Sequence, residues 1–168
     1  NILPVRLLGG DGYPALADLH SKNYTCPYQR SILDQGLRGN YDYIDGFVAP
    51  KACDATTRFS LIWENHIKKP YIYFVNLPHK RSENAISFFR ESLLRFKEAL
   101  EKDFGEISES SLKHAIHVYN ENRALLKQVY ELRKKVPPVI SGVEAHKIVV
   151  SSMTIPKDKH NLLLHQLL

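Results

Sequence analysis

The sequence is poor in cysteine and in long apolar runs, and each shortage excludes a class of protein. The chain holds two cysteines among 168 residues, too few for the disulfide framework of a small secreted domain. Its apolar runs are only a few residues long, so no membrane-spanning helix is expected. The chain begins at Asn1 with neither an initiator methionine nor a signal-peptide pattern, and we expect a fragment of a cytoplasmic protein.

The rest of the composition is that of a folded domain with a mild positive charge. Hydrophobic residues make up 43% of the chain and the formal net charge is +5, so the chain has enough apolar material for a sizeable core. The basic residues fall mostly on predicted helix surfaces, which indicates that they form a solvated face. The alternative is that they bind an acidic partner, such as a CoA phosphate or an electron donor. No motif for nucleic-acid binding accompanies the charge, so nucleic acid is not an expected partner.

Short strands and helices alternate over the first part of the chain, a pattern typical of a parallel sheet in an α/β fold. Strands are predicted at residues 2–8, 43–49 and 71–75. Helices are predicted at residues 14–20, 26–37, 52–66, 82–104, 108–135, 142–153 and 157–168. The predicted fold class is therefore α/β, with a small parallel Rossmann-like sheet and long helices.

Each of the two longest predicted helices carries an apolar stripe at helical spacing. The first stripe consists of Ala85, Phe89, Leu93, Phe96 and Leu100, and the second of Leu112, Ile116, Tyr119, Leu126 and Tyr130. Arg123 falls in the middle of the second stripe, so we expect it to be buried beside a carboxylate or several carbonyls. On the opposite, solvent-facing side lie His114, His117 and Glu121, whose helical spacing resembles a metal site, although no metal is expected there.

Both cysteines are predicted to lie where a helix begins. Cys26 directly precedes Pro27, and Cys53 follows the strand predicted at 43–49. A helix start favours the thiolate over the thiol, and sheets of this kind hold their ligands at the carboxyl ends of the strands. The two thiols could bind a soft metal together. From the residues alone, a single reactive thiol, a disulfide and simple burial remain open.

The segments around these cysteines resemble the 2-hydroxyacyl-CoA dehydratase and benzoyl-CoA reductase family. They are Cys-Pro-Tyr-Gln-Arg-Ser at 26–31, Tyr-Asp-Tyr-Ile-Asp-Gly-Phe-Val at 41–48, Ala-Cys-Asp-Ala-Thr at 52–56, Trp63, Asn-Leu-Pro at 76–78, the run 107–126 and Ile-Ser-Gly-Val-Glu at 140–144. Their order and spacing match over nearly the whole chain. The chain is similar to the N-terminal part of a subunit like the D-component of 2-hydroxyglutaryl-CoA dehydratase.

The resemblance implies a cofactor and a domain plan. Subunits of the family are two-domain α/β proteins that pair with a related subunit, and each holds a [4Fe-4S] cluster through three cysteines. The first two match Cys26 and Cys53, and the third belongs to a second domain that this sequence does not reach. Two thiolates alone hold such a cluster poorly. We expect an α/β cluster-binding region at 1–80, a long helical pair at 81–136, and a helical linker toward the missing domain at 137–168.

The resemblance also implies radical chemistry on an acyl-CoA. An ATP-dependent iron–sulfur activator would deliver a low-potential electron, and the resulting ketyl radical of a 2-hydroxyacyl-CoA would expel hydroxide on the way to an enoyl-CoA. In the benzoyl-CoA branch the electrons would reduce an aromatic ring. A cluster-free structural or binding paralogue, and a double-cubane-type reductase of a small molecule, are the alternatives.

Four residues are candidates for substrate binding, and none is identified as catalytic. Arg30 and Ser31 lie one turn into the helix that follows Cys26, where they would reach the cluster or the thioester, or else serve as a surface arginine and a helix-start serine. Tyr28 and Trp63 would wall the pocket, or else pack in the core. Asp54 would cap the helix after Cys53, or else hydrogen-bond near the cluster sulfurs.

Overall fold

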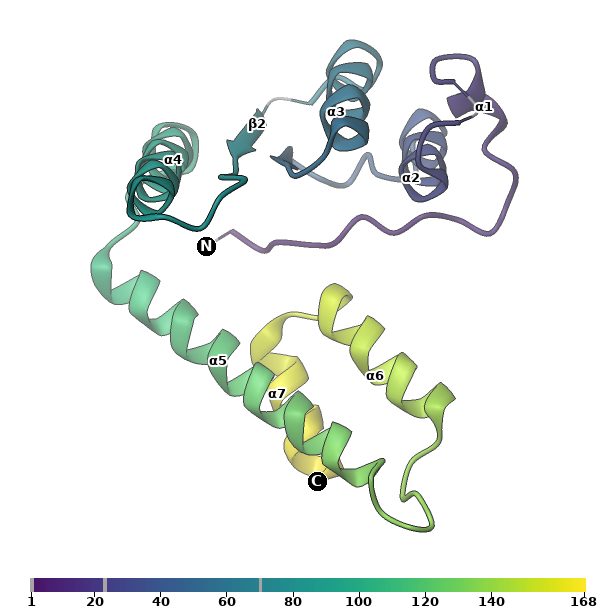
Figure 1. Cartoon of the computed structure of the whole chain (residues 1–168), viewed down its shortest axis with the longest axis vertical. Coiled ribbons are helices and arrows are strands. Elements are labelled where there is room, and N and C mark those ends of the chain that lie inside the picture. The colour runs from purple at the N-terminus through teal and green to yellow at the C-terminus, as the bar shows by residue number, and fades with distance from the viewer. Residues whose placement is uncertain (1, 23, 70) are drawn as a thin grey trace. The chain divides into compact units, whose positions relative to one another are not determined.

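The computed structural model describes residues 2–22, 24–69 and 71–168, and its contacts divide the chain into two compact units (Figure 1). Residues Leu7–Gly105 form the first, here called the α/β unit. Residues Asn1–Arg6 and Glu106–Leu168 form the second, here called the helical unit. The predicted α/β class is confirmed, because helices accompany a small parallel sheet.

Two parallel strands form the centre of the α/β unit. Strand β1 (Gly46–Lys51) pairs with β2 (Tyr71–Asn76), and helix α3 (Asp54–His66) is the crossover that joins them. The register runs from Gly46 opposite Tyr71 to Lys51 opposite Asn76. Both strands therefore end at the same edge of the sheet, where parallel sheets commonly carry their ligands.

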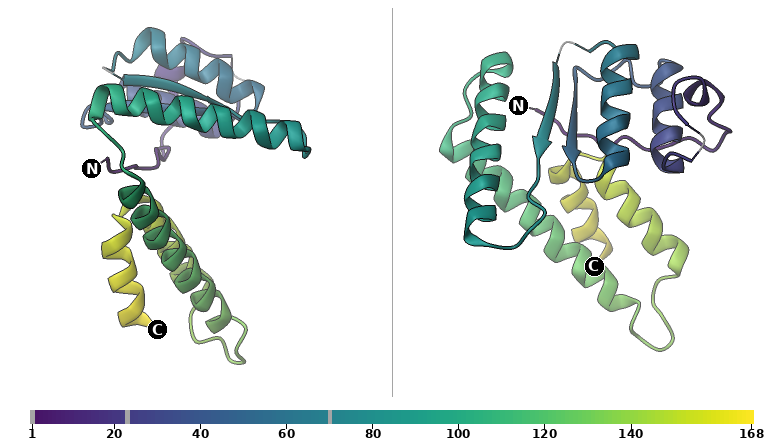
Figure 2. Two further views of the ribbon diagram at one scale, coloured as in Figure 1. Left: turned by 90° about the vertical axis from the view of Figure 1, so that its left-hand side faces the viewer. Right: turned by 45° about the horizontal axis from the view of Figure 1, so that its top comes forward.

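The helices of this unit lie on the two sides of the sheet (Figures 1 and 2). Helix α3 packs on β1, α2 (Pro27–Leu37) packs on α3, and α1 (Ala15–Asp18) packs on α2. On the other side, α4 (Glu83–Phe104) packs on β2. The apolar stripe predicted for α4 does face the strand, since the Phe96 ring lies 4.9 Å from that of Tyr73, although Leu93 is 45% exposed.

The strand predicted at residues 2–8 is absent, and this prediction was wrong. Where this segment enters the α/β unit, its backbone carbonyls accept hydrogen bonds from side-chain hydroxyls and not from a neighbouring strand. Tyr28 donates to the carbonyl of Leu7 at 2.9 Å, and Tyr41 donates to the carbonyl of Leu8. The carbonyls of Leu7 and Leu8 therefore have hydrogen-bond partners without a neighbouring strand.

Trp63 of α3 is the centre of the core of the α/β unit. It is fully buried, and its ring stacks on that of Phe47 with 4.6 Å between the centroids. Tyr41 stacks on a second side, at 6.0 Å. Helix α2 approaches closely at Gly36, where an added Cβ would lie 2.8 Å from Cζ3 of Trp63 and 2.5 Å from Cδ1 of Ile67. The contact between α2 and α3 therefore requires glycine at position 36.

The helical unit consists of α5 (Glu109–Leu132), α6 (Gly142–Thr154) and α7 (Lys157–Leu167). Its small apolar core is formed by Leu125, Val129 and Leu164, with Leu126, Ile140 and Ile148 around them. Helix α6 begins with a complete capping box, in which Ser141 and Glu144 exchange hydrogen bonds. In the part of the chain that the structure describes, no helix combines the length and the apolar content needed to cross a bilayer.

The predicted inner face of α5 was wrong by one residue. Arg123 is exposed and donates to Oδ1 of Asn120 at 2.7 Å, while Asn122 is 2% exposed. Helix α7 packs on the face that carries Asn122, Leu125 and Val129. The prediction missed this face because Asn122, a polar residue, occupies one of its buried positions.

Asn122 belongs to a buried polar network that joins α5, α6 and α7. Its Nδ2 atom lies 2.7 Å from Nδ1 of His160 and 2.7 Å from Oδ1 of Asn161. An amide nitrogen can only donate, so Nδ1 of His160 accepts and Nε2 carries the proton, 3.1 Å from Oγ of Ser151. Protonation of Nδ1 would set two donors against each other. The neutral imidazole is therefore the form that fits the folded unit.

We expect Gly36→Ala to destabilise the protein. Overpacking of a core costs about 1–3 kcal/mol, and the better helix propensity of alanine returns at most about 1 kcal/mol, so the free energy of unfolding should fall by about 1 kcal/mol. Urea unfolding would measure the change. Gly12→Ala is the matched control, since an added Cβ there meets nothing within 4 Å. Equal effects of the two variants would contradict the close approach of α2 and α3.

We also expect the helical unit to lose stability in mild acid because of His160. Burial, and then the nearby Lys157, lower the pKa of His160 below its ordinary value. In the unfolded chain His160 binds a proton near pH 6.5, whereas in the folded unit it stays neutral to lower pH. The free energy of unfolding should be level above about pH 7 and decline below about pH 6.5. His160→Gln should flatten this decline, and the exposed His146→Gln should leave it unchanged.

Candidate functional site

Each cysteine lies where a helix begins, as the sequence predicts, and the structure places each at the N-cap position. Cys26 precedes α2 with Pro27 at the first helical position, and its side chain accepts no capping hydrogen bond. Cys53 precedes α3, and its side chain does cap the helix. Both thiols are free, with Cys26 half-buried and Cys53 exposed. The two residues therefore present sulfur at two helix starts of the same unit.

The sulfur of Cys53 interacts with two groups of one residue. The backbone N–H of Thr56 donates to Sγ at 3.4 Å, and the Thr56 hydroxyl lies 3.2 Å from Sγ. The hydroxyl, followed by the backbone N–H, lowers the pKa of the Cys53 thiol. This surrounding favours the thiolate, which is the form that binds metals.

A hydrogen bond connects the first turns of the two cysteine-bearing helices. Nε2 of Gln29 donates to Oγ1 of Thr56 at 2.7 Å. Gln29 lies in the first turn after Cys26, and Thr56 in the first turn after Cys53. The contact brings both helix starts, and so both cysteines, to one end of the α/β unit. Neither residue is predicted from the sequence to have this role, although each stands at the third position after its cysteine.

An open pocket of about 410 Å³ lies beside Cys53, within the α/β unit. It is lined by Lys51, Cys53, Asp54, Thr57, Asn76, Leu77, His79 and Phe88. Lys51 and Asn76 are the last residues of β1 and β2, so the pocket opens at the carboxyl ends of the strands, the usual ligand position in such sheets. Cys53 is the cysteine that lines it.

The four predicted substrate-binding residues do not line this pocket. Trp63 lies fully buried in the core. The hydroxyl of Tyr28 donates to Leu7, and that of Ser31 donates to the Gly10 carbonyl at 3.0 Å. In this structure these side chains pack the core or hold the N-terminal segment against α2, and their contacts with a substrate stay predictions.

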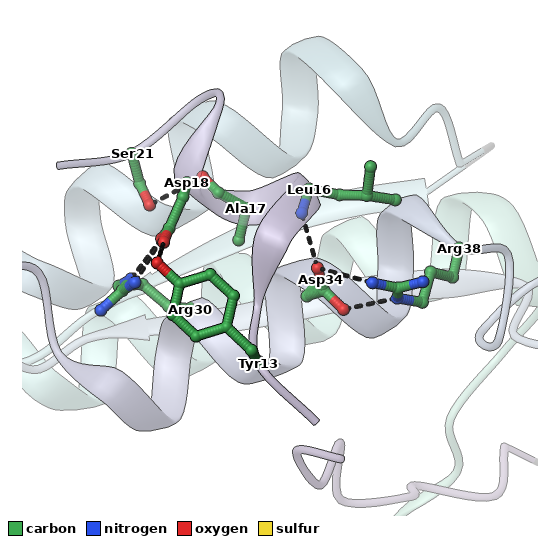
Figure 3. A network of polar contacts seen from close by, with 8 residues as sticks. All are labelled: Tyr13, Leu16, Ala17, Asp18, Ser21, Arg30, Asp34 and Arg38. Carbon is green, nitrogen blue, oxygen red and sulfur yellow. Dashed lines mark hydrogen bonds and ion pairs between the residues drawn. The ribbon is translucent and has the colours of Figure 1, made fainter. Parts of the chain in front are cut away.

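Arg30, the fourth of these residues, fixes α1 on α2 (Figure 3). Its Nε donates to Oδ1 of Asp18 at 2.7 Å, and the Tyr13 hydroxyl donates to Oδ2 of the same carboxylate, also at 2.7 Å. The hydrogen bond from Tyr13, then that from Arg30, lower the pKa of Asp18. The predicted substrate contact of Arg30 likewise stays a prediction.

A second carboxylate in Figure 3 holds the other end of α1. Asp34 of α2 is 3% exposed and accepts from the Leu16 backbone N–H at 2.8 Å and from Nε of Arg38 at 2.6 Å. Burial alone would raise the pKa of Asp34, but the hydrogen bonds from Arg38 and Leu16 outweigh it and lower the pKa. Together with Asp18, it places α1 firmly on α2.

The predicted capping role of Asp54 was wrong, because Cys53 itself caps α3. Asp54 instead accepts from Nε of Arg58, one turn later, at 2.7 Å. Over residues 2–22, 24–69 and 71–168, no three histidine, cysteine, aspartate or glutamate side chains gather as a metal site would require. Cys26 and Cys53 therefore do not belong to such a group of three among the described residues.

Comparison with known proteins gives a match over the whole chain. The family model of the 2-hydroxyglutaryl-CoA dehydratase D-component matches residues 1–168. A benzoyl-CoA reductase subunit of Thauera aromatica is 29% identical over 167 residues, which cover 97% of this chain and 43% of the relative. The beta subunit of lactoyl-CoA dehydratase from Anaerotignum propionicum is 26% identical over 168 residues, with 99% and 44% covered.

A further relative is the beta subunit of (R)-2-hydroxyglutaryl-CoA dehydratase from Acidaminococcus fermentans, 24% identical over 157 residues, which cover 89% of this chain and 41% of the relative. The chain thus spans less than half the length of these curated relatives.

We expect Cys53 to react with iodoacetamide before Cys26 in metal-free protein at neutral pH. Cys53 is exposed and its pKa is lowered by Thr56, so a larger fraction of this accessible thiol is thiolate. Mass spectrometry of timed samples would locate the first label. Labelling of Cys26 first would contradict the surroundings described for Cys53.

Proposed function

The chain belongs to the 2-hydroxyglutaryl-CoA dehydratase D-component family, and we propose from this that it is the cluster-binding part of an iron–sulfur enzyme subunit. The enzyme would dehydrate a 2-hydroxyacyl-CoA or reduce an aromatic acyl-CoA. The observation that carries the proposal is the joining of the two cysteine-bearing helix starts through Gln29 and Thr56, in a chain that matches the family from end to end.

The two thiols suit part of a [4Fe-4S] ligand set. Both are free, both stand at helix starts where backbone N–H groups favour negative charge, and Sγ of Cys53 already has hydrogen-bonding partners fit for a thiolate. Such a cluster requires more than two protein ligands to be held well. In our proposal Cys26 and Cys53 supply two, and the remaining ligand comes from outside the residues that the structure describes.

The pocket beside Cys53 is the proposed place for the acyl-CoA thioester. When bound, the cluster would supply low-potential electron transfer and an iron that acts as a Lewis acid. Lys51 and His79 can present positive or hydrogen-bonding groups toward a thioester oxygen. Leu77 and Phe88 add apolar surface to the lining of the pocket.

The partners in this proposal are a related second subunit and an ATP-dependent iron–sulfur activator that supplies the electron. The names of the relatives support the first of these, since each is designated as one subunit of its enzyme. We place the enzyme in the cytoplasm. Relatives from both branches match at similar identity, so the proposal includes dehydration and aromatic-ring reduction alike.

A cluster-free structural or binding subunit is a second candidate. It is favoured by one observation, that among the described residues no three metal-ligating side chains gather. Such a subunit would keep the fold and bind a partner without electron transfer. The metal content of the protein separates the two candidates.

We expect the full-length protein, purified without oxygen together with its partner subunit, to carry about four iron atoms and as many sulfides at this site. Cys26→Ala and Cys53→Ala should each abolish the corresponding electron paramagnetic resonance signal after dithionite reduction, because each removes a ligand. Arg58→Ala, which breaks an exposed ion pair of the same helix, is the control and should keep both iron and signal.

Activity assays then decide the branch. With an activator, ATP and a reductant, turnover of a 2-hydroxyacyl-CoA would establish the dehydratase, and turnover of benzoyl-CoA the reductase. Absence of iron from the anaerobically purified wild-type protein would contradict the proposal of a cluster enzyme and favour the cluster-free alternative.

A further inference from the structure

Three groups form a continuous hydrogen-bonded chain that ends on the sulfur of Cys53. Nε2 of Gln29 lies 2.7 Å from Oγ1 of Thr56, and this Oγ1 lies 3.2 Å from Sγ of Cys53. The Thr56 backbone N–H adds a second contact to the sulfur, at 3.4 Å. The chain crosses from α2 to α3, so its two ends belong to the two helices that begin at the cysteines.

The direction of this chain follows from the number of protons available. The amide nitrogen of Gln29 can only donate, and the Thr56 hydroxyl has a single proton. Because Oγ1 already accepts from Gln29, its proton is left for the sulfur. A thiolate bound to iron has no proton of its own and can only accept. With metal in place the chain therefore runs from Gln29 through Thr56 to Cys53.

We propose that Thr56 and Gln29 are positioning residues that tune the proposed cluster, an inference that rests on the function proposed above. The Thr56 hydroxyl donates to the Cys53 ligand, and Gln29 orients that hydroxyl. Hydrogen bonds to ligand sulfurs offset the negative charge that a cluster gains on reduction, so they raise its midpoint potential. Thr56 thus makes the cluster easier to reduce.

The orientation of the Gln29 amide supports this assignment. Its Oε1 atom is buried without a hydrogen-bond partner among the described residues, while Nε2 points at Thr56. The opposite orientation would bury both N–H groups of the amide where Oε1 now lies, and would present an acceptor to the hydroxyl. The Thr56 proton would then turn away from the sulfur. A glutamate at position 29 imitates that reversed arrangement.

The test is a redox titration of the cluster, followed by electron paramagnetic resonance, in the full-length protein with its partner subunit. Thr56→Val keeps the shape of the side chain and the backbone N–H but removes the hydroxyl, so the midpoint potential should become more negative. Thr56→Ser keeps the hydroxyl and should retain the wild-type potential. Thermal unfolding of both variants serves as the structural readout, which a tuning role leaves similar for the two.

Variants of Gln29 test the direction of the chain. Gln29→Glu should shift the potential in the same direction as Thr56→Val, because the carboxylate takes the hydroxyl proton. Gln29→Met removes the donor and should give a smaller shift. Since Gln29 acts through Thr56, adding Gln29→Met to Thr56→Val should not move the potential beyond that of Thr56→Val alone.

The outcomes separate this inference from the proposed function. A wild-type protein without a cluster overturns both. A cluster whose potential is the same in wild type and Thr56→Val, or shifts equally in Thr56→Val and Thr56→Ser, overturns the inference and leaves the proposed function standing. If Thr56→Val does not retain the cluster, Gln29→Glu decides instead, since it keeps the hydroxyl: a more negative potential supports the inference, and an unchanged potential overturns it.

Discussion

The close packing of α2 against α3 is the contact on which the rest of the α/β unit depends. Gly36 allows α2 to approach the fully buried Trp63, and Trp63 in turn stacks on Phe47 of β1. The same helix pair carries Cys26 and Cys53 at its N-termini. The apolar packing near the C-terminal ends of α2 and α3 therefore fixes how their N-terminal ends, which carry the thiols, lie relative to each other.

Local signals in the sequence were sufficient for the elements that carry the site, and insufficient for the contacts between them. Pro27 marked the start of α2, and the apolar run at 71–75 marked β2, because both signals act within a few residues. The hydrogen bond between Gln29 and Thr56 joins residues far apart in the chain, and nothing local indicates it. In α5, the inner face was mispredicted because Asn122 is polar and was therefore expected to face solvent. Its burial depends on hydrogen bonds with His160 and Asn161, which the sequence does not reveal.

The two units satisfy buried polar groups in different ways. In the helical unit, the imidazole of His160 is held uncharged between the neutral side chains of Asn122 and Ser151. In the α/β unit, the carboxylates Asp18 and Asp34 keep their charge by accepting from arginine. Acidification therefore weakens the helical unit near the range of histidine and the α1–α2 contact only near the range of carboxylates.

The capping role of Cys53 shows what holds a metal ligand in position in this fold. In many metal sites the metal itself holds the ligands together. Here the sulfur of Cys53 caps α3, and Gln29 links that helix start to the one that follows Cys26. The position of the Cys53 helix start therefore rests on contacts between protein groups, so a change at Thr56 or Gln29 acts on the ligand through the fold.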